Sequence, residues 1–387
     1  MVRHSSRFLF LRPLLLCVIL WAGAGLAGAG LAGAGLAGAQ RVVAQLPDPA
    51  VSLTMTGDLH ALTRAGELWN LAGTPVRLAA GLSTDAPLTS CAGQVAATQR
   101  DGQLWWGQRR AAGNLSVSAG TLCTPSGELL AISRAGEALL ISRAGTVSRR
   151  MPVAALPDTR PHLADLNGDG RPWVVLLTRP TTRYAHGVLG DAVEAAGLVA
   201  LDPVSLAVRA TLTLPAPLVF EDWEARPLRA AGRDVLAVVR ASPQGGGALT
   251  VVGLQGGTLR VLAAGPDFGR GGRWLAPMTD GADLYAVHTP HLGGALHRYA
   301  LTGTRLTATP VTGSPLVSNH RLGERLVTGG VWQGGVWLGT QEQTRTLGPD
   351  GLTLPAAPSS AVLASARGAF LGTQDGRVWQ LPDRRAP

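Results

Sequence analysis

The chain has 387 residues, of which 46% are hydrophobic and 15% are charged. This apolar content is enough for a sizeable core, and the 51 glycines and 26 prolines are typical of turn-rich β structure, so the composition excludes a disordered chain. The formal charge is +9, yet every basic residue is an arginine and none is a lysine. Because these arginines do not cluster on one element, the charge argues against nucleic-acid binding.

Residues 1–39 resemble an export signal. Three arginines precede the apolar run PLLLCVILWAGAGLAGAGLAGAGLAGA, and Ala37 and Ala39 provide a small-x-small cleavage site before Gln40. The uncharged run is also long enough to span a bilayer of roughly 30 Å as an uncleaved anchor. In either case we expect residues 40–387 outside the cytoplasm, as a periplasmic or secreted protein or as one anchored to the membrane and facing outward.

Two cysteines, Cys91 and Cys123, remain after the predicted signal. In an oxidising compartment they could form a disulfide that stabilises the fold by roughly 3 kcal/mol. Two buried free thiols are the alternative.

From residue 47 onwards one pattern recurs: an apolar strand, a short turn containing glycine, and a second strand. The clearest copies are LHALTRAGELWNL, QVAATQRDGQLWWG, ELLAISRAGEALLI and GAFLGTQDGRVWQL, and four looser copies lie between the third and the last. The glycine that introduces the second strand falls at Gly66, Gly102, Gly136, Gly197, Gly247, Gly294, Gly335 and Gly376.

A recurrence of about 40 residues without helical periodicity predicts an all-β fold, a single β-propeller domain over residues 40–387. We count eight copies, which predicts eight blades of four-stranded antiparallel sheets, with seven as the alternative. A two-sheet sandwich would not require the same phrase to return so regularly. Val42–Thr54 and Ala361–Leu381 are the segments expected to close the ring.

The stretch HLADLNGDGRPWVVLL contains an oxygen-rich turn. Asp165, Asn167 and Asp169 alternate, and Gly170 allows a tight bend, which is the pattern of a calcium loop. The position where such a loop places a further carboxylate is Trp173. The alternative is a hairpin turn in which Asp and Asn side chains bind their own backbone. We expect no cofactor; calcium is possible at this turn, and we expect it to contribute little.

The same stretch, ADLNGDGRPWVVLL, resembles the FG-GAP or VCBS type of propeller repeat. GLVALDPVSLAV resembles the PQQ-like propeller repeat, although the gap between Gly197 and Ala200 is one residue short. The first resemblance covers one hairpin and the second one or two blades. Both imply the propeller fold, and the second also implies a quinone-dependent dehydrogenase as one alternative activity.

The fourth to seventh copies carry longer connections than the others: TRYAHGVLGDAVEA, FEDWEARP, GGRWLAP, HTPHLGG and SNHRLG. Adjacent strands of a blade are antiparallel, so loops between second and third strands share a face with the starts of first strands. We therefore expect these phrases to meet on one face and to bind a ligand. The candidate residues are Arg183, Tyr184, His186, Asp191, Asp222, Trp223, Trp274, His288, His291, Asn319 and His320.

Two classes of function fit this pattern. The first is an exported, monomeric, non-catalytic propeller that binds a small molecule, glycan or protein through this face, with the two tryptophans as flat apolar walls. The second is an enzyme, a hydrolase, lyase or quinone-dependent dehydrogenase, with histidines and carboxylates at the channel mouth. His288 and His291 could also chelate a metal with His186 or His320, although no established metal motif is present.

Overall fold

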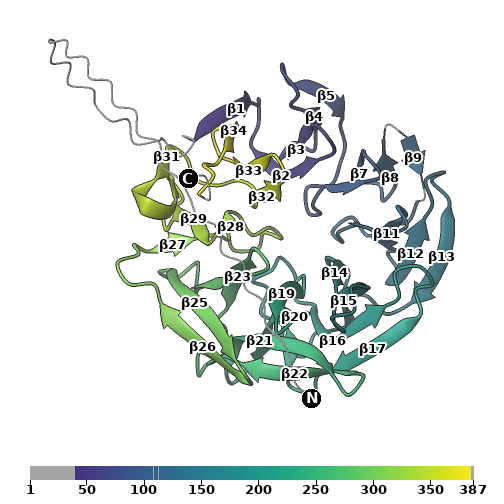
Figure 1. Cartoon of the computed structure of the whole chain (residues 1–387), viewed down its shortest axis with the longest axis vertical. Coiled ribbons are helices and arrows are strands. Elements are labelled where there is room, and N and C mark those ends of the chain that lie inside the picture. The colour runs from purple at the N-terminus through teal and green to yellow at the C-terminus, as the bar shows by residue number, and fades with distance from the viewer. Residues whose placement is uncertain (1–39, 108, 112, 385–387) are drawn as a thin grey trace, which may run out of the picture. The chain divides into compact units, whose positions relative to one another are not determined.

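The computed structural model describes residues 40–107, 109–111 and 113–384, and these residues form an almost entirely β structure (Figure 1). Within these ranges the only helical element is the 3-10 turn η1 (Pro349–Gly351), and no helix is long and apolar enough to cross a membrane. The predicted signal, residues 1–39, lies outside the described residues.

The first three sheets each have four antiparallel strands in chain order. They contain β2 (Ala50–Met55), β3 (Leu59–Thr63), β4 (Leu68–Asn70) and β5 (Val76–Ala79); β6 (Thr89–Cys91), β7 (Gln94–Thr98), β8 (Leu104–Trp106) and β9 (Arg109–Ala111); and β10 (Leu122–Cys123), β11 (Leu129–Ile132), β12 (Glu137–Ile141) and β13 (Val147–Pro152).

The next nine strands form one sheet made of two meanders. The first meander contains β14 (His162–Ala164), β15 (Trp173–Thr181), β16 (Glu194–Leu201) and β17 (Val208–Thr213). The second contains β18 (Val219–Phe220), β19 (Arg226–Ala230), β20 (Arg233–Ser242), β21 (Gly246–Gln255) and β22 (Thr258–Ala264). The only residues that pair between them are Ala195 of β16 and Phe220 of β18.

Three further sheets follow. They contain β23 (Leu275–Thr279), β24 (Leu284–His288), β25 (Ala295–Thr302) and β26 (Arg305–Pro310); β27 (Val317–Ser318), β28 (Gly330–Trp332), β29 (Gly335–Thr340), β30 (Thr346–Leu347) and β31 (Thr353–Leu354); and β32 (Leu363–Ser365), β33 (Gly368–Gly372) and β34 (Arg377–Gln380), which β1 (Arg41–Gln45) completes. The antiparallel pairing of β1 with β34 joins the two ends of the described chain and agrees with the expected closure.

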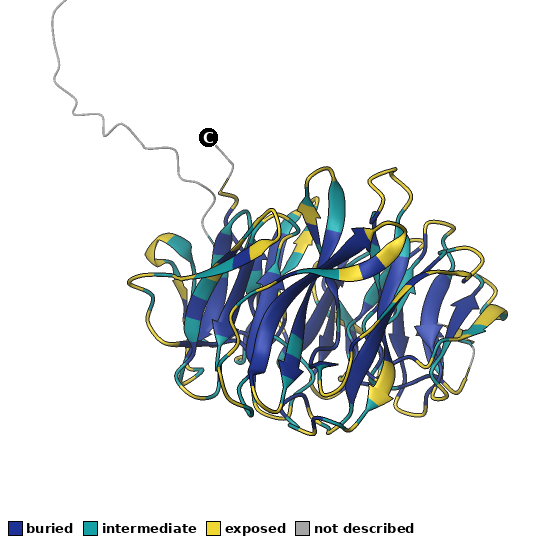
Figure 2. Cartoon of the chain, turned by 90° about the horizontal axis from the view of Figure 1, so that it is seen from below, coloured by how far each residue is buried: buried dark blue, intermediate teal, exposed yellow. Residues whose placement is uncertain are grey.

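The core of the described unit is divided into clusters that lie between successive meanders. Leu62 of the first sheet packs with Val95 of the second, and Leu53 of β2 packs with Phe370 of β33, so the first and last sheets also share a core. Figure 2 shows this distribution, with buried residues along the strands and exposed residues in the loops at both ends. Apolar burial between neighbouring sheets therefore holds the repeated units around a common centre.

The glycines of the clear copies are required by close backbone contact between sheets. Gly66, Gly102, Gly136 and Gly376 all have φ between +76° and +84°, a region that side chains disfavour. A Cβ on Gly66 would lie 2.5 Å from the carbonyl oxygen of Leu82, whose own N–H donates to Gly66. The repeated glycine thus allows each turn to bind the linker of the next sheet.

The seventh copy was placed incorrectly. The seventh copy, RLVTGGVWQGGVWLGT, was expected to place Gly335 at the position of Gly66 and Gly376, but Gly335 begins β29 directly after the β28–β29 turn. The turn that corresponds to those at Gly66 and Gly376 lies instead at residues 341–345, between β29 and β30.

Cys91 and Cys123 form a disulfide in the structure, with their Cα atoms 5.0 Å apart. Cys91 ends β6 and Cys123 ends β10, so the bond joins the first strands of two neighbouring sheets. It thus crosslinks two sheets that no strand pairing connects.

Candidate functional site

Two first strands are interrupted by insertions. β18 and β19 both pair with β20, and residues 221–225 between them leave the ladder. β27 and β28 both pair with β29, and residues 319–329 between them leave it in the same way. The phrases FEDW and SNH therefore interrupt first strands, where the sequence analysis expected them to open these strands.

A cavity of about 180 Å³ lies on the face that carries the loops between second and third strands, which we call the loop face. His186 of the β15–β16 loop, Trp274 before β23, His291 of the β24–β25 loop and Leu322 of the 319–329 insertion line it. We call this cavity the upper pocket. It brings together four of the segments that the sequence analysis singled out.

Glu221 holds the imidazole of His186. Its Oε1 lies 2.5 Å from Nδ1 of His186, and the carboxyl group is fully buried. Burial raises the pKa of Glu221, and the hydrogen bond from His186 opposes that rise. With Nδ1–H donated to the carboxylate, Nε2 is left as an acceptor that faces Gly272 at the wall of the upper pocket.

Two further imidazoles, those of His291 and His320, form a hydrogen-bonded pair at the pocket. Nε2 of His320 lies 2.7 Å from the carbonyl of Glu324, so this nitrogen carries the proton and Nδ1 is an acceptor. Nδ1 then accepts from Nε2 of His291 at 2.9 Å. Burial lowers the pKa of His320 to about 3, and burial followed by the nearby His186 lowers that of His291. Both rings are therefore neutral at physiological pH.

Trp223 and Trp274 form the base of this region. Their side chains are at most 2% exposed, and the rings meet edge to face with centroids 6.1 Å apart. The indole N–H of Trp274 donates to the Glu221 carbonyl at 3.0 Å, and its ring stacks on His291 at an interplanar angle of 8°. Trp223 lies under the guanidinium of Arg160, 5.0 Å from its ring centroid. The expected pair of flat walls is thus reduced to Trp274 alone.

His288 lies away from the upper pocket, which corrects the expectation of four imidazoles in one site. Its ring stacks on His297 with centroids 3.7 Å apart, and its Nε2 lies 2.7 Å from the hydroxyl of Tyr299. Burial and the neighbouring His297 lower the pKa of His288 to about 4. His288 ends β24 and contacts the sheet, whereas His291 lies in the loop beyond it. The two residues therefore do not chelate a metal together.

Four other candidates hold the loops in place. Arg183 donates to the carbonyls of Leu214 and Leu218, and the Tyr184 hydroxyl accepts the N–H of Gly272 at 2.9 Å. Asp191 pairs with Arg325 at 2.8 Å, and the fully buried Asn319 lies 3.5 Å from the Ala276 carbonyl. These contacts position the residues that line the pocket.

Arg325 anchors the 319–329 insertion, and sequence reasoning missed it. Its guanidinium pairs with Asp158 and Asp191 and lies 3.9 Å from Asp85, three carboxylates that belong to three different parts of the ring. Arg160 also donates to the Arg325 carbonyl. Burial raises the pKa of Asp158 to about 6 despite the opposing charge of Arg325. The insertion is thus held to distant sheets by one arginine.

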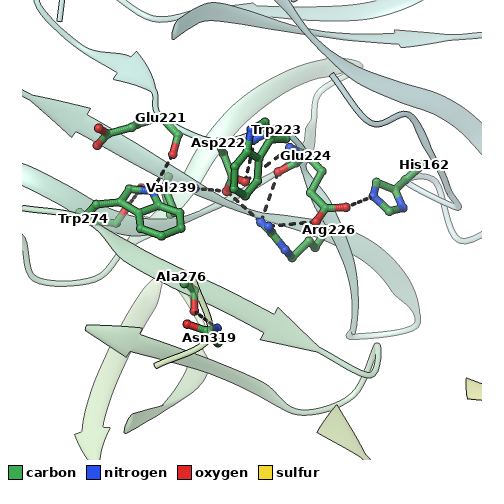
Figure 3. Close-up of polar contacts among 12 residues, drawn as sticks. His162, Glu221, Asp222, Trp223, Glu224, Arg226, Val239, Trp274, Ala276 and Asn319 are labelled. Carbon is green, nitrogen blue, oxygen red and sulfur yellow. Dashed lines mark hydrogen bonds and ion pairs between the residues drawn. The ribbon is translucent and has the colours of Figure 1, made fainter. Parts of the chain in front are cut away.

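A buried charge network extends from the 221–225 insertion (Figure 3). The carboxylate of Asp222 accepts a hydrogen bond from the guanidinium of Arg226, with 2.8 Å between Oδ2 and the nitrogen. It also accepts hydrogen bonds from the backbone N–H groups of Trp223 and Val239. Arg226 also lies 3.0 Å from Glu224, whose other oxygen lies 2.6 Å from Nε2 of His162. The sequence analysis assigned Asp222 to ligand binding, but its carboxylate is 0% exposed and fully used within this network.

The Asn-Gly-Asp-Gly turn satisfies itself with backbone donors. The carboxylate of Asp165 accepts the N–H groups of Gly168, Asp169 and Gly170 at 2.9 to 3.2 Å, and Arg229 lies 3.5 Å away. Asp169 accepts the N–H of Arg171. These contacts fit the hairpin alternative, and among the described residues no group of three or more His, Cys, Asp or Glu side chains is arranged to hold a metal ion.

Three exposed leucines surround the upper pocket. Leu292 and Leu322 line it and are 63% and 71% exposed, and Leu316, which is 57% exposed, lies beside Gly293. Leucines of this exposure are uncommon on soluble proteins when they lie together. The loop face therefore combines a small pocket with an apolar rim.

No family model and no curated protein match the chain. Among solved structures it is similar to BamB from Moraxella catarrhalis, with 14% identity over 90% of this chain and 100% of that chain and a TM-score of 0.53. Two other solved structures have lower TM-scores. A catalytically inactive virginiamycin B lyase from Staphylococcus aureus with quinupristin has 11% identity over 89% of this chain and 99% of that chain, with a TM-score of 0.45. YCF48 bound to D1 peptide has 7% identity over 88% of this chain and 94% of that chain, with a TM-score of 0.46. The likeness to BamB shows the fold alone: the chain is an all-β protein of the β-propeller class.

Proposed function

We propose that this chain is an exported β-propeller of eight blades that binds a partner protein through the loop face around the upper pocket. The count of eight follows if the nine-stranded sheet is taken as two blades, because one residue pair alone joins its meanders. Export rests on residues 1–39, and the disulfide between Cys91 and Cys123 supports it because such bonds persist in oxidising compartments.

The observation that carries the proposal is the apolar rim around a small pocket. Leu292 and Leu322 are exposed and line the same cavity as Trp274 and His291. An aromatic or aliphatic side chain of a partner fits a cavity of about 180 Å³ and would bury these leucines. Burial of a leucine side chain stabilises a complex by about 2 kcal/mol, so the rim supplies a substantial driving force.

The same features favour a protein over a glycan. A sugar ring stacks on exposed aromatic faces, but Trp223 and Trp274 are almost fully buried. The groups that are exposed are aliphatic, and the imidazole of His186, held at Nδ1 by Glu221, adds one polar group to the pocket. A partner side chain that fills the small apolar pocket and makes one hydrogen bond to it is a common arrangement in protein interfaces.

The proposal is tested by site-specific photocrosslinking in the cells that produce the protein. A benzophenone amino acid is placed at Leu322 or, as a matched control, at Val76, which is 56% exposed on the first sheet. We expect a discrete crosslinked protein from position 322 and none from position 76. Equal crosslinking from both positions, or none from position 322, would contradict a partner at this face.

An enzyme remains the second candidate because of one observation. A fully buried carboxylate, Glu221, orients His186 at the pocket, which is the arrangement that makes an imidazole a general base. The replacement His186→Gln separates the candidates. For a binding protein it lowers partner affinity modestly, whereas for an enzyme it abolishes turnover.

A further inference from the structure

A second cavity, of about 310 Å³, lies at the other end of β24 from the upper pocket. Gly281, in the turn before β24, lines this cavity, whereas Thr289, directly after β24, lines the upper pocket. The two cavities therefore belong to opposite ends of the ring. We call the second one the lower pocket.

The lower pocket has one polar and one apolar side. The polar side is formed by Arg160, His162, Glu224 and Arg226, and the apolar side includes Pro277, Met278, Val331 and Val362. Such a division is typical of a site for a small molecule, in which a few polar groups fix the orientation and apolar groups supply the contact area. Neither the sequence motifs nor the partner-binding face accounts for it.

His162 is the polar group that is free to bind. Its Nε2 lies 2.6 Å from Glu224, so this nitrogen donates to the carboxylate and Nδ1 is the ring nitrogen left to meet a ligand. Among the described residues none donates a hydrogen bond to Nδ1, and the side chain is 33% exposed. His162 therefore lines the lower pocket with one ring nitrogen held by Glu224 and the other without a hydrogen-bond partner among the described residues.

The network behind His162 fixes both its position and the charge of the pocket. Burial alone would raise the pKa of Glu224, but Arg226 and His162 outweigh burial and hold it well below its usual range. Burial raises the pKa of Asp222, and the ion pair with Arg226 opposes that rise. Arg226 pairs with both Asp222 and Glu224, so these three side chains satisfy one another behind the lower pocket.

We propose that the lower pocket is a second ligand site, separate from the partner-binding face, for a small uncharged molecule with a hydroxyl group on an apolar body. The hydroxyl donates to Nδ1 of His162, and the apolar body lies against Met278, Val331 and Val362. An ion of either sign is disfavoured, because the charged groups Arg226, Asp222 and Glu224 already pair with one another.

The test uses phenol as the probe and benzene as its analogue without the hydroxyl group, with the full exported chain labelled at histidine nitrogens. We expect phenol to shift the Nδ1 resonance of His162 in a saturable manner. Benzene should bind at least roughly tenfold more weakly, because it leaves the buried acceptor without a partner. No saturable change at His162, or equal affinity for the two probes, would overturn the proposal.

Two variants distinguish a ligand site from a structural role. Val362→Trp fills the apolar side and should abolish the phenol response, whereas Val76→Trp, on an exposed strand far along the chain, should not change it. Glu224→Gln replaces the carboxylate with an uncharged amide that can accept or donate, so it no longer fixes the tautomer of His162; the nitrogen resonances of His162 should change and phenol affinity should fall. A phenol response that survives Val362→Trp would contradict the site, whatever the behaviour of the loop face.

Discussion

The ring has two halves that share one strand pattern and differ in what connects the strands. The sheets of β2 to β13, together with β32 to β34 and β1, have short glycine turns such as those at Gly66 and Gly376. The sheets of β14 to β31 carry the long β15–β16 loop and the insertions 221–225 and 319–329. The ladders are alike, so the chemical difference between the halves comes from loops and insertions on a common scaffold.

Buried charge follows the same division. Every buried Asp, Glu and Arg among the described residues lies between Asp158 and Arg226, while the first three sheets bury apolar residues and uncharged polar groups. A buried charge is costly unless it is paired, so its concentration in one half indicates a role other than fold stability. The comparison predicts that the two halves respond differently to the same kinds of substitution.

The largest effect is expected from Arg226→Ala. This change leaves the buried carboxylates of Asp222 and Glu224 without their cation and should lower the free energy of unfolding by about 3–5 kcal/mol. Arg77→Ala is the control in the simple half, because its pair with Glu67 is 57% exposed at the arginine and should be worth less than about 1 kcal/mol. Urea unfolding measures both, and similar losses would remove the distinction.

The disulfide is the strongest covalent constraint of the simple half. Cys91 and Cys123 are separated by 32 residues, so replacing both with alanine should cost roughly 3.5 kcal/mol through the entropy of the unfolded chain. The comparison of oxidised and reduced wild-type protein in denaturant gives the same quantity independently. A loss below about 1 kcal/mol in both experiments would show that the sheets on either side hold without the crosslink.

Asp158 should make stability depend on pH. Its pKa in the folded protein is raised to about 6 by burial, so between about pH 4 and pH 6 the folded state keeps a proton that the unfolded state has lost. Stability from this group is present below pH 4 and is lost as the pH rises through 6, by about 3 kcal/mol. Asp158→Asn should remove that slope in urea unfolding at the two pH values, and an unchanged slope would contradict the assignment.

Calcium should have the smallest effect. The Asp165 carboxylate already accepts three backbone N–H groups and lies near Arg229, so a cation would compete with contacts that are in place. We expect the melting temperatures with calcium and with a chelator to agree within about one degree. An occupied site at a hundredfold excess of calcium over Kd would instead stabilise the fold by about 2.7 kcal/mol and raise the melting temperature clearly. A rise of several degrees with micromolar calcium would restore the metal interpretation.

The repeated glycine made the fold predictable from the sequence. Gly66, Gly102, Gly136 and Gly376 are fixed by a positive φ and by contact with the next linker, so the same short phrase returns wherever the turn returns. The prediction for the seventh copy was wrong because the 319–329 insertion interrupts the first strand of that sheet. The hairpin of β28 and β29 also contains a glycine turn and therefore matches the repeated pattern. Local spacing therefore identifies the repeat but not its register where a strand is interrupted.

The site was only partly predictable for a related reason. His186, His291 and His320 occur in long connections, and antiparallel strand order brings these connections to one face. Asp158 and Arg325 lie in unremarkable phrases 167 residues apart, so no local pattern marks them. His162 opens the stretch with the oxygen-rich turn, but its partner Glu224 lies 62 residues away. Their roles depend on which sheets meet at the centre of the ring.

The most direct test of the central claim compares one exposed apolar residue from each half. Leu322→Asp and Val76→Asp each place a charge on the surface, at positions that are 71% and 56% exposed. The tagged chain is purified from the producing cells, and its native mass is measured. The account predicts a partner complex for the wild type and for Val76→Asp, and the chain alone for Leu322→Asp. A complex that survives Leu322→Asp, or one that Val76→Asp destroys, would contradict a binding face confined to the half with the long connections.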